Sequence, residues 1–124
     1  MGERGNVFVK EPGEDDDTGV WLYTHWGCYE LPGTLADALH RGKSRWGDAP
    51  YLTRIIFNSM VSGDEMGTTG FGISARMGDN NYPILVVDDV AGTVSVGSEV
   101  LAYQEFIDHV RKHGRTFEDC GWED

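Results

Sequence analysis

The sequence holds few groups that could do chemistry, and His25 has the strongest case for a function among its four histidines. It stands among aromatic residues near the end of a predicted strand, and Cys28 and Glu30 follow within five positions. A histidine that acts as a general base needs such a thiol or carboxylate within hydrogen-bond reach. Proximity in sequence does not supply that geometry. A structural or ligand-contacting role for His25 is therefore favoured over a catalytic role in a small hydrolase.

Two further sets of residues suggest metal or acid-base chemistry. His109 and His113 lie four apart on a predicted helix, which matches half of a zinc site, but no third ligand stands at a known spacing. Asp88 and Asp89 end an apolar strand, where carboxylates serve either catalysis or a turn. The common nucleophile, phosphate and dinucleotide motifs are absent from the sequence. We therefore predict no catalytic residue, metal or cofactor, and enzymatic activity stays uncertain, with the balance against it.

Aromatic residues are densest between positions 20 and 32, which contain two of the four Trp and two of the five Tyr. Such a cluster is either an anchor of the core or the wall of a binding site, because its rings combine a large apolar area with polar edges. Arginines are the groups that would bind a phosphate next to stacked rings. The candidate ligand-binding residues are Trp21, Tyr23, His25, Trp26, Tyr29, Arg45, Trp46, Arg54 and Arg76.

Acidic residues outnumber basic ones by 21 to 10, and the formal net charge is -11. A polyanion would be repelled, so non-specific nucleic-acid binding is disfavoured. The acidity has three open explanations, which are ordinary solubility, adaptation to high salt, and a surface that engages a basic partner or imitates nucleic acid. The oligomeric state cannot be inferred.

The length of 124 residues fits one domain, with an acidic loop at 11–19 and a tail at 115–124 that either docks by its rings or frays. No apolar run is long enough to span a bilayer, and the N-terminus lacks the order of a signal peptide, so a cytoplasmic location without membrane contact is expected. Cys28 and Cys120 have no metal-type spacing and are expected to be reduced thiols.

Hydrophobic periodicity predicts the elements that position these residues. Strands are expected over 6–10, 20–26, 70–77, 82–88 and 93–96. Helices are expected from a cap at Thr34 to Gly42, from Asp48 or Ala49 to Gly63, and from about Ser98 to His113. The order β-β-α-α-β-β-β-α predicts an α+β fold, in which three helices pack on one face of a mainly antiparallel sheet of about five strands.

The stretch Tyr23-Thr24-His25-Trp26-Gly27-Cys28-Tyr29, followed by Leu31-Pro32, resembles small uncharacterised proteins of prokaryotes and their viruses that carry a Tyr-x-His-Trp-Asp-Gly-Tyr-Pro core. This chain lacks the Asp before Gly27 and has Cys28 inserted after it. No established activity comes with the resemblance, which implies only an accessory or mobile-element context.

Three functions follow as hypotheses from these observations. The first is a non-enzymatic protein that binds a small planar or nucleotide-like ligand and sequesters it, in an accessory or virus-encoded role. The second is an acidic inhibitor or adaptor that binds a basic protein partner. The third, and weakest, is the hydrolase that uses His25. Salt distinguishes the first two hypotheses. Binding of a basic protein should weaken as the salt concentration rises, because only that binding depends on charge complementarity over a surface.

Overall fold

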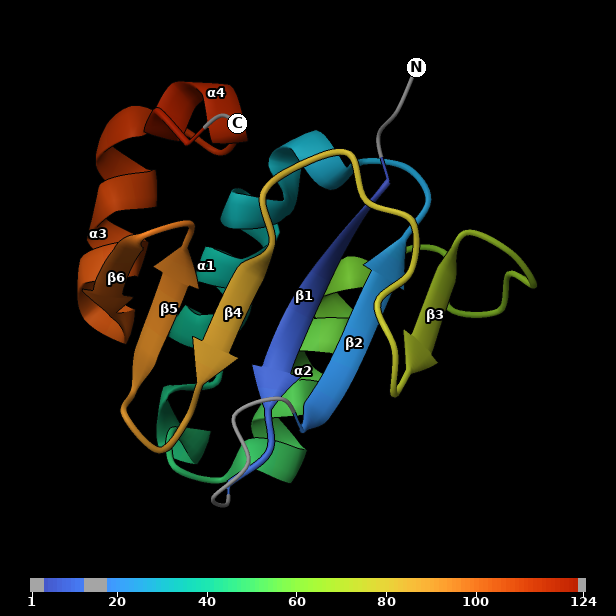
Figure 1. Ribbon diagram of the computed structural model, residues 1–124, viewed down its shortest axis with the longest axis horizontal. Helices are drawn as coiled ribbons and strands as arrows, with labels where there is room; N and C mark the ends of the chain where they lie inside the picture. The colour runs from blue at the N-terminus through green and yellow to red at the C-terminus, as the bar shows by residue number, and fades with distance from the viewer. Residues whose placement is uncertain (1–3, 13–17, 123–124) are drawn as a thin grey trace.

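The protein is α+β, with one mixed six-stranded sheet, as the computed structural model of residues 4–12 and 18–122 shows (Figure 1). Along the chain the strands are β1 (Gly5–Lys10), β2 (Gly19–Thr24), β3 (Phe71–Ser74), β4 (Leu85–Asp88), β5 (Thr93–Val96) and β6 (Glu99–Ala102). The helices are α1 (Leu31–Arg41), α2 (Ala49–Met60), α3 (Tyr103–His113) and the short α4 (Phe117–Cys120), with 3-10 turns η1 (Cys28–Glu30) and η2 (Lys43–Arg45).

The strands lie in the order β3-β2-β1-β4-β5-β6. Neighbouring strands are antiparallel except β1 and β4, which pair in parallel with Val7 opposite Leu85 and Val9 opposite Val87. Parallel neighbours need a long crossover connection. Here the connection from β1 to β4 contains β2, α1, α2 and β3, so the centre of the sheet joins the first strand to the second half of the chain.

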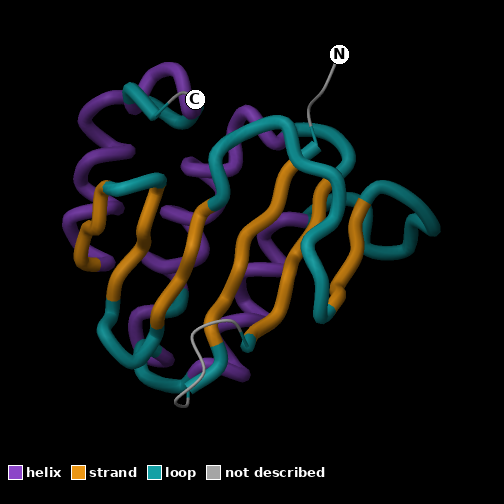
Figure 2. The backbone as a smooth tube through the Cα atoms, viewed as in Figure 1, coloured by secondary structure: helices purple, strands orange, loops and turns teal. Residues whose placement is uncertain are grey.

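The helices cover one face of the sheet, and the core lies between the two layers (Figure 2). Alternate strand residues point toward them, as period-two geometry requires, and Val7, Leu22, Leu85, Val87 and Val94 are fully buried. Helix α1 contacts both α2 and α3 and so forms the middle of the helical layer. No helix among the described residues is long and apolar enough to cross a membrane.

The other face of the sheet, here called the open face, carries Phe8 and Trp21, whose ring centroids are 4.5 Å apart. The connection from β3 to β4 is fastened next to it by the buried Asn6. The Asn6 amide donates to the carbonyls of Gly78 and Asp79, and its oxygen accepts from the Gly78 N–H at 3.1 Å. A polar side chain is buried at this point because every part of its amide has a partner.

The predicted α+β class is confirmed, but the element count is corrected to six strands and four helices. The extra strand is β6, where a helix had been expected from about Ser98. Val100 fits the helical periodicity of the next residues, yet it pairs with Ser95 and is 62% exposed. Helix α3 begins only at Tyr103, where the Glu105 side chain accepts from the Ala102 N–H at 2.8 Å.

The bounds of several elements differ from the prediction. Strand β2 ends at Thr24, β3 covers only Phe71–Ser74, and β4 begins at Leu85. Helix α1 starts at Leu31 with Pro32 in its first turn, because proline needs no amide partner there, and Thr34 lies inside the helix instead of capping it. The tail docks, since Phe117 and Trp122 are buried and α4 forms between them. In the acidic loop, residues 13–17 lie outside the described residues, while the Glu11 N–H donates to the Thr18 carbonyl at 2.8 Å.

Candidate functional site

The aromatic segment leaves the sheet through a sharp bend between β2 and α1. Gly27 has φ of 77°, a left-handed conformation that glycine adopts without steric cost, so the chain turns there as the sequence predicts. The His25 N–H donates to the Gly70 carbonyl at 2.7 Å, which ties the bend to the start of β3. At this bend the Trp26 and Tyr29 side chains are partly exposed, with 47% and 42% of their surface accessible.

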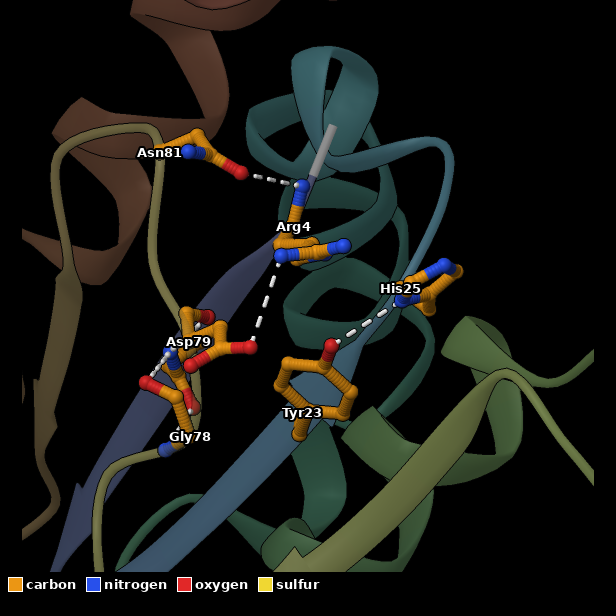
Figure 3. Close-up of polar contacts among 7 residues, drawn as sticks. Arg4, Tyr23, His25, Gly78, Asp79 and Asn81 are labelled. Carbon is orange, nitrogen blue, oxygen red and sulfur yellow. Dashed lines mark hydrogen bonds and ion pairs between the residues drawn. The ribbon is translucent and has the colours of Figure 1, made fainter. Parts of the chain in front are cut away.

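The first three candidate residues lie on or next to the open face instead of in a pocket. Trp21 packs on Phe8, and Tyr23 contacts the turn at Gly78. His25 is exposed, and its Nδ1 lies 3.2 Å from the Tyr23 hydroxyl (Figure 3). Among the described residues, the Tyr23 hydroxyl is the hydrogen-bond partner of the His25 ring. The two groups named for a hydrolase are occupied elsewhere, because Cys28 is buried and the Glu30 carboxylate lies 3.7 Å from Arg115.

Trp26 lines one of two pockets that flank the bend. This Trp26 pocket has a volume of about 410 Å³ and lies between the ends of β2 and α2 and the starts of α1 and β3. The Trp26 ring meets Phe71 edge-on, at a centroid distance of 6.2 Å. The polar residues of the wall are Thr24, Thr34, Ser62 and Asp64.

Tyr29 lines the second, larger pocket, with a volume of about 520 Å³. The rings of this Tyr29 pocket belong to Tyr29, Tyr82, Phe117 and Trp122, and its polar residues are Asn81, Thr116 and Glu118. Tyr82 and Phe117 are stacked, with centroids 5.4 Å apart and planes 16° from parallel. A volume of this size falls in the range of pockets that hold small molecules.

The walls of the Tyr29 pocket are fixed before any ligand arrives. The Trp122 indole is stacked on Phe106, at a centroid distance of 5.4 Å, and on His109, at 4.7 Å, and its Nε1–H donates to Glu99 at 2.8 Å. Phe117 is only 2% exposed. Side chains held in this way lose little further entropy when they contact a ligand.

The remaining candidates do not join the aromatic residues of the bend. Arg45 lies in η2, where its guanidinium is 4.6 Å from the Tyr51 ring and near Asp48. Trp46 packs on Tyr103 and donates to the Leu39 carbonyl. The last two arginines are exposed on other elements, Arg54 on α2 and Arg76 after β3. The predicted combination of stacked rings and arginines is therefore not assembled in either pocket.

Charge around the Tyr29 pocket is acidic. Arg115, next to Thr116 in the chain, is paired with Glu30 and with Asp37 at 2.9 Å. Arg4, whose N–H donates to Asn81, is paired with Asp79 at 3.4 Å (Figure 3). Within the described part of the chain, Glu118 has no ion pair. The carboxylate at this pocket is thus left uncompensated.

The other chemical candidates have structural roles in this fold. Burial by itself raises the pKa of Asp88, but the N–H groups of Ala91 and Val90 together with Lys10 outweigh it, and the pKa is lowered. Asp89 accepts from the Tyr103 hydroxyl at 2.7 Å, and burial followed by this bond raises the pKa of Tyr103. Asp88 therefore closes the turn between β4 and β5, as turn chemistry predicts, while Asp89 ties this turn to Gly47 and Tyr103.

The histidine pair and the cysteines line no pocket described above. The His109 and His113 rings are 4.3 Å apart, and His109 Nε2 lies 3.0 Å from the Cys120 carbonyl oxygen. Across residues 4–12 and 18–122, no three His, Cys, Asp or Glu side chains are grouped to hold a metal ion. Cys28 and Cys120 are buried thiols and do not form a disulfide with each other.

Sequence reasoning missed most of the Tyr29 pocket. It selected Tyr29 but not Tyr82, Phe117, Glu118 or Trp122, which are separated from it by 53 residues or more. A local signal existed only for the tail, where Phe117 and Trp122 stand in an otherwise polar segment and so indicate docking.

Comparison of this chain with protein-family models, curated protein sequences and solved structures finds no match. The resemblance of the Tyr23–Tyr29 segment therefore remains a prediction, and function has to be argued from the geometry.

Proposed function

We propose that this protein is a non-enzymatic binding protein, an inhibitor or adaptor whose acidic surface engages a basic protein partner through the bend between β2 and α1. One observation carries the proposal. The half-exposed rings of Trp26 and Tyr29 stand between two pockets whose described walls contain a carboxylate each, Asp64 and Glu118, and no Lys or Arg.

Exposed aromatic rings are typical of protein interfaces, where Trp and Tyr contribute much of the binding energy. The carboxylates beside them give the bend an acidic surround that attracts basic partners and repels acidic ones. The net charge of -11 extends the same preference over the whole molecule and speeds the encounter with a basic protein.

An anionic ligand fits this arrangement less well. A nucleotide phosphate needs arginine, lysine or backbone donors beside the stacked base. Arg45, Arg54 and Arg76 do not line either pocket, so a nucleotide at the bend would meet carboxylates instead. A hydrolase that uses His25 is supported less still, because the ring contacts a tyrosine hydroxyl and neither Cys28 nor Glu30 is available to it.

A second candidate function is binding of a small planar molecule without a negative charge. The stacked Tyr82 and Phe117 rings and the volume of about 520 Å³ favour it, since a flat ring system could occupy the Tyr29 pocket. Native mass spectrometry of purified protein distinguishes this candidate, because a sequestered small molecule would copurify at one equivalent.

The proposal is tested by affinity capture from an extract of the encoding organism at 20 mM and 500 mM NaCl, with the bound proteins identified by mass spectrometry. We expect a saturable partner of high isoelectric point that is released by salt, because screening weakens charge complementarity. Trp26→Ala should lower its capture, whereas Tyr51→Ala, which removes an equally exposed ring on α2, should not. A partner of low isoelectric point, or capture that salt does not change, would contradict the proposal.

A further inference from the structure

The Tyr29 pocket has a composition that selects one kind of group. Four of its wall residues are aromatic, and its only charged residue among those described is Glu118. Aromatic ring faces carry partial negative charge and attract cations, and a carboxylate does so more strongly. An apolar wall with a single anion therefore favours a group that is both flat and positively charged.

Among the described residues, no Lys or Arg of the chain itself lines this pocket. Arg115 precedes Thr116 of the pocket wall and is paired with Glu30 and Asp37. Arg4 is bonded to Asn81 of the wall and is paired with Asp79. Glu99 lies beyond Trp122 and accepts from its indole, which adds a further negative charge behind the wall. The site thus offers an unneutralised carboxylate beside rings that are already in position.

The chain contains one example of the contact that such a pocket would make. The Arg45 guanidinium lies 4.6 Å from the centre of the exposed Tyr51 ring. Guanidinium groups stack on aromatic rings and donate two parallel N–H bonds to a carboxylate, which the compact ammonium of lysine does less well. A pocket lined by rings and closed by Glu118 matches both properties of arginine.

We infer that the Tyr29 pocket is the recognition site for an arginine side chain of the basic partner. The guanidinium stacks on Tyr82, whose ring is only partly buried, and pairs with Glu118, while the aliphatic part of the arginine contacts Tyr29 at the rim. This inference rests on the proposed function and names the residue type that the partner inserts.

The test titrates the ¹⁵N-labelled protein with N-acetyl-arginine methylamide and follows the Trp122 indole N–H and the amides of residues 116–122 by NMR. The matched control ligand is N-acetyl-citrulline methylamide, which has the same shape without the charge. We expect saturable shifts at these signals with the arginine probe and none with the citrulline probe. Glu118→Gln and Tyr29→Ala should each weaken binding of the arginine probe by roughly five-fold.

Matched control variants are Glu65→Gln, an exposed carboxylate in the 61–70 loop, and Tyr51→Ala, an exposed ring on α2. Both should leave the affinity for the arginine probe unchanged. Equal shifts with the citrulline probe, shifts that map outside the pocket, or tighter binding of neutral adenine at the same signals would each overturn the inference.

The same variants separate this inference from the proposed function. If a basic protein is captured in a salt-dependent way but Glu118→Gln captures it equally well, the arginine site is wrong and the proposed function stands. If the arginine probe occupies the pocket while no basic protein is captured, the proposed function is wrong and the arginine site stands.

Discussion

The two pockets that flank the bend share a carboxylate and an aromatic rim, yet they are built differently. The Tyr29 pocket draws its walls from the docked C-terminal segment and from the β3–β4 connection, and two of its rings, Phe117 and Trp122, are stacked and buried. Half of the residues that line the Trp26 pocket are hydroxyl-bearing or glycine, and its half-exposed Trp26 ring lies against Gly70. The contrast indicates a preorganised recognition site on one side and an adaptable contact surface on the other.

The largest expected effect tests whether the Tyr29 side is the rigid one. Trp122→Ala removes a ring that is 6% exposed and stacked on two rings of α3, so we expect a loss of about 3–5 kcal/mol in the free energy of unfolding. Trp26→Ala, at 47% exposure, should cost about 1 kcal/mol. Urea denaturation followed by circular dichroism measures both, and similar losses for the two variants would remove the contrast.

The next effect tests how the Trp26 side is supported. Gly70 has φ of 96°, and a Cβ there would overlap the Trp26 ring, so Gly70→Ala should cost about 1–3 kcal/mol and displace the indole. Gly72→Ala is the matched control, because a Cβ at that position has open space. Thermal unfolding and Trp fluorescence report the two changes, and an equal response of both variants would contradict this account.

A smaller effect concerns the thiol behind the Tyr29 pocket. Burial, and then the neighbouring Asp119, raises the pKa of Cys120 to about 11, and the thiol donates to the Gly114 carbonyl. The reactive thiolate is therefore scarce below that pH, and we expect iodoacetamide to alkylate Cys120 at least about ten-fold more slowly than free cysteine at pH 8. Peptide mapping by mass spectrometry measures the rate, and addition of 6 M urea should restore ordinary reactivity. Rapid alkylation in the native state would show that α4 opens readily.

The smallest effect separates charge from structure. Glu118→Gln and Asp64→Asn change exposed carboxylates that have no ion pair in the described structure, so each should alter the free energy of unfolding by less than about 0.5 kcal/mol. Partner association should still slow with both, and more with Glu118→Gln if that pocket holds the partner's arginine. Surface plasmon resonance with the captured partner gives the rates, and a larger effect of Asp64→Asn would reverse the ranking of the pockets.

Local signals in the sequence predicted much of the fold. Alternation at Val20–Thr24 and the glycine at the bend gave β2 and its end, and Pro50 with the apolar spacing of Leu52 and Ile56 gave α2. Strand β6 was missed because its four residues run directly into α3 and share its helical spacing. The parallel pairing of β1 with β4 has no local signal, since the two strands are 75 residues or more apart.

The site was predicted only in part, because contacts between segments that are distant in sequence leave no local signal. Trp26 and Tyr29 are adjacent to a glycine bend, which indicates exposure at an element end. Their partners come from the other end of the chain, and no periodicity connects Tyr29 with Tyr82 or Trp122. The arginines were chosen for charge alone, and the fold distributes them over different elements.

The pairing of β1 with β4 also determines when the sheet can be completed during folding. The first hairpin closes early and locally, but its free edge stays open until residues 85–88 reach it, and closing so long a loop costs chain entropy before any contact repays it. During synthesis, β1 and β2 therefore emerge long before the strand that completes the sheet centre. We expect the complete fold to be reached late, with the unpaired edge of the hairpin exposed to chaperones and to aggregation in the interval.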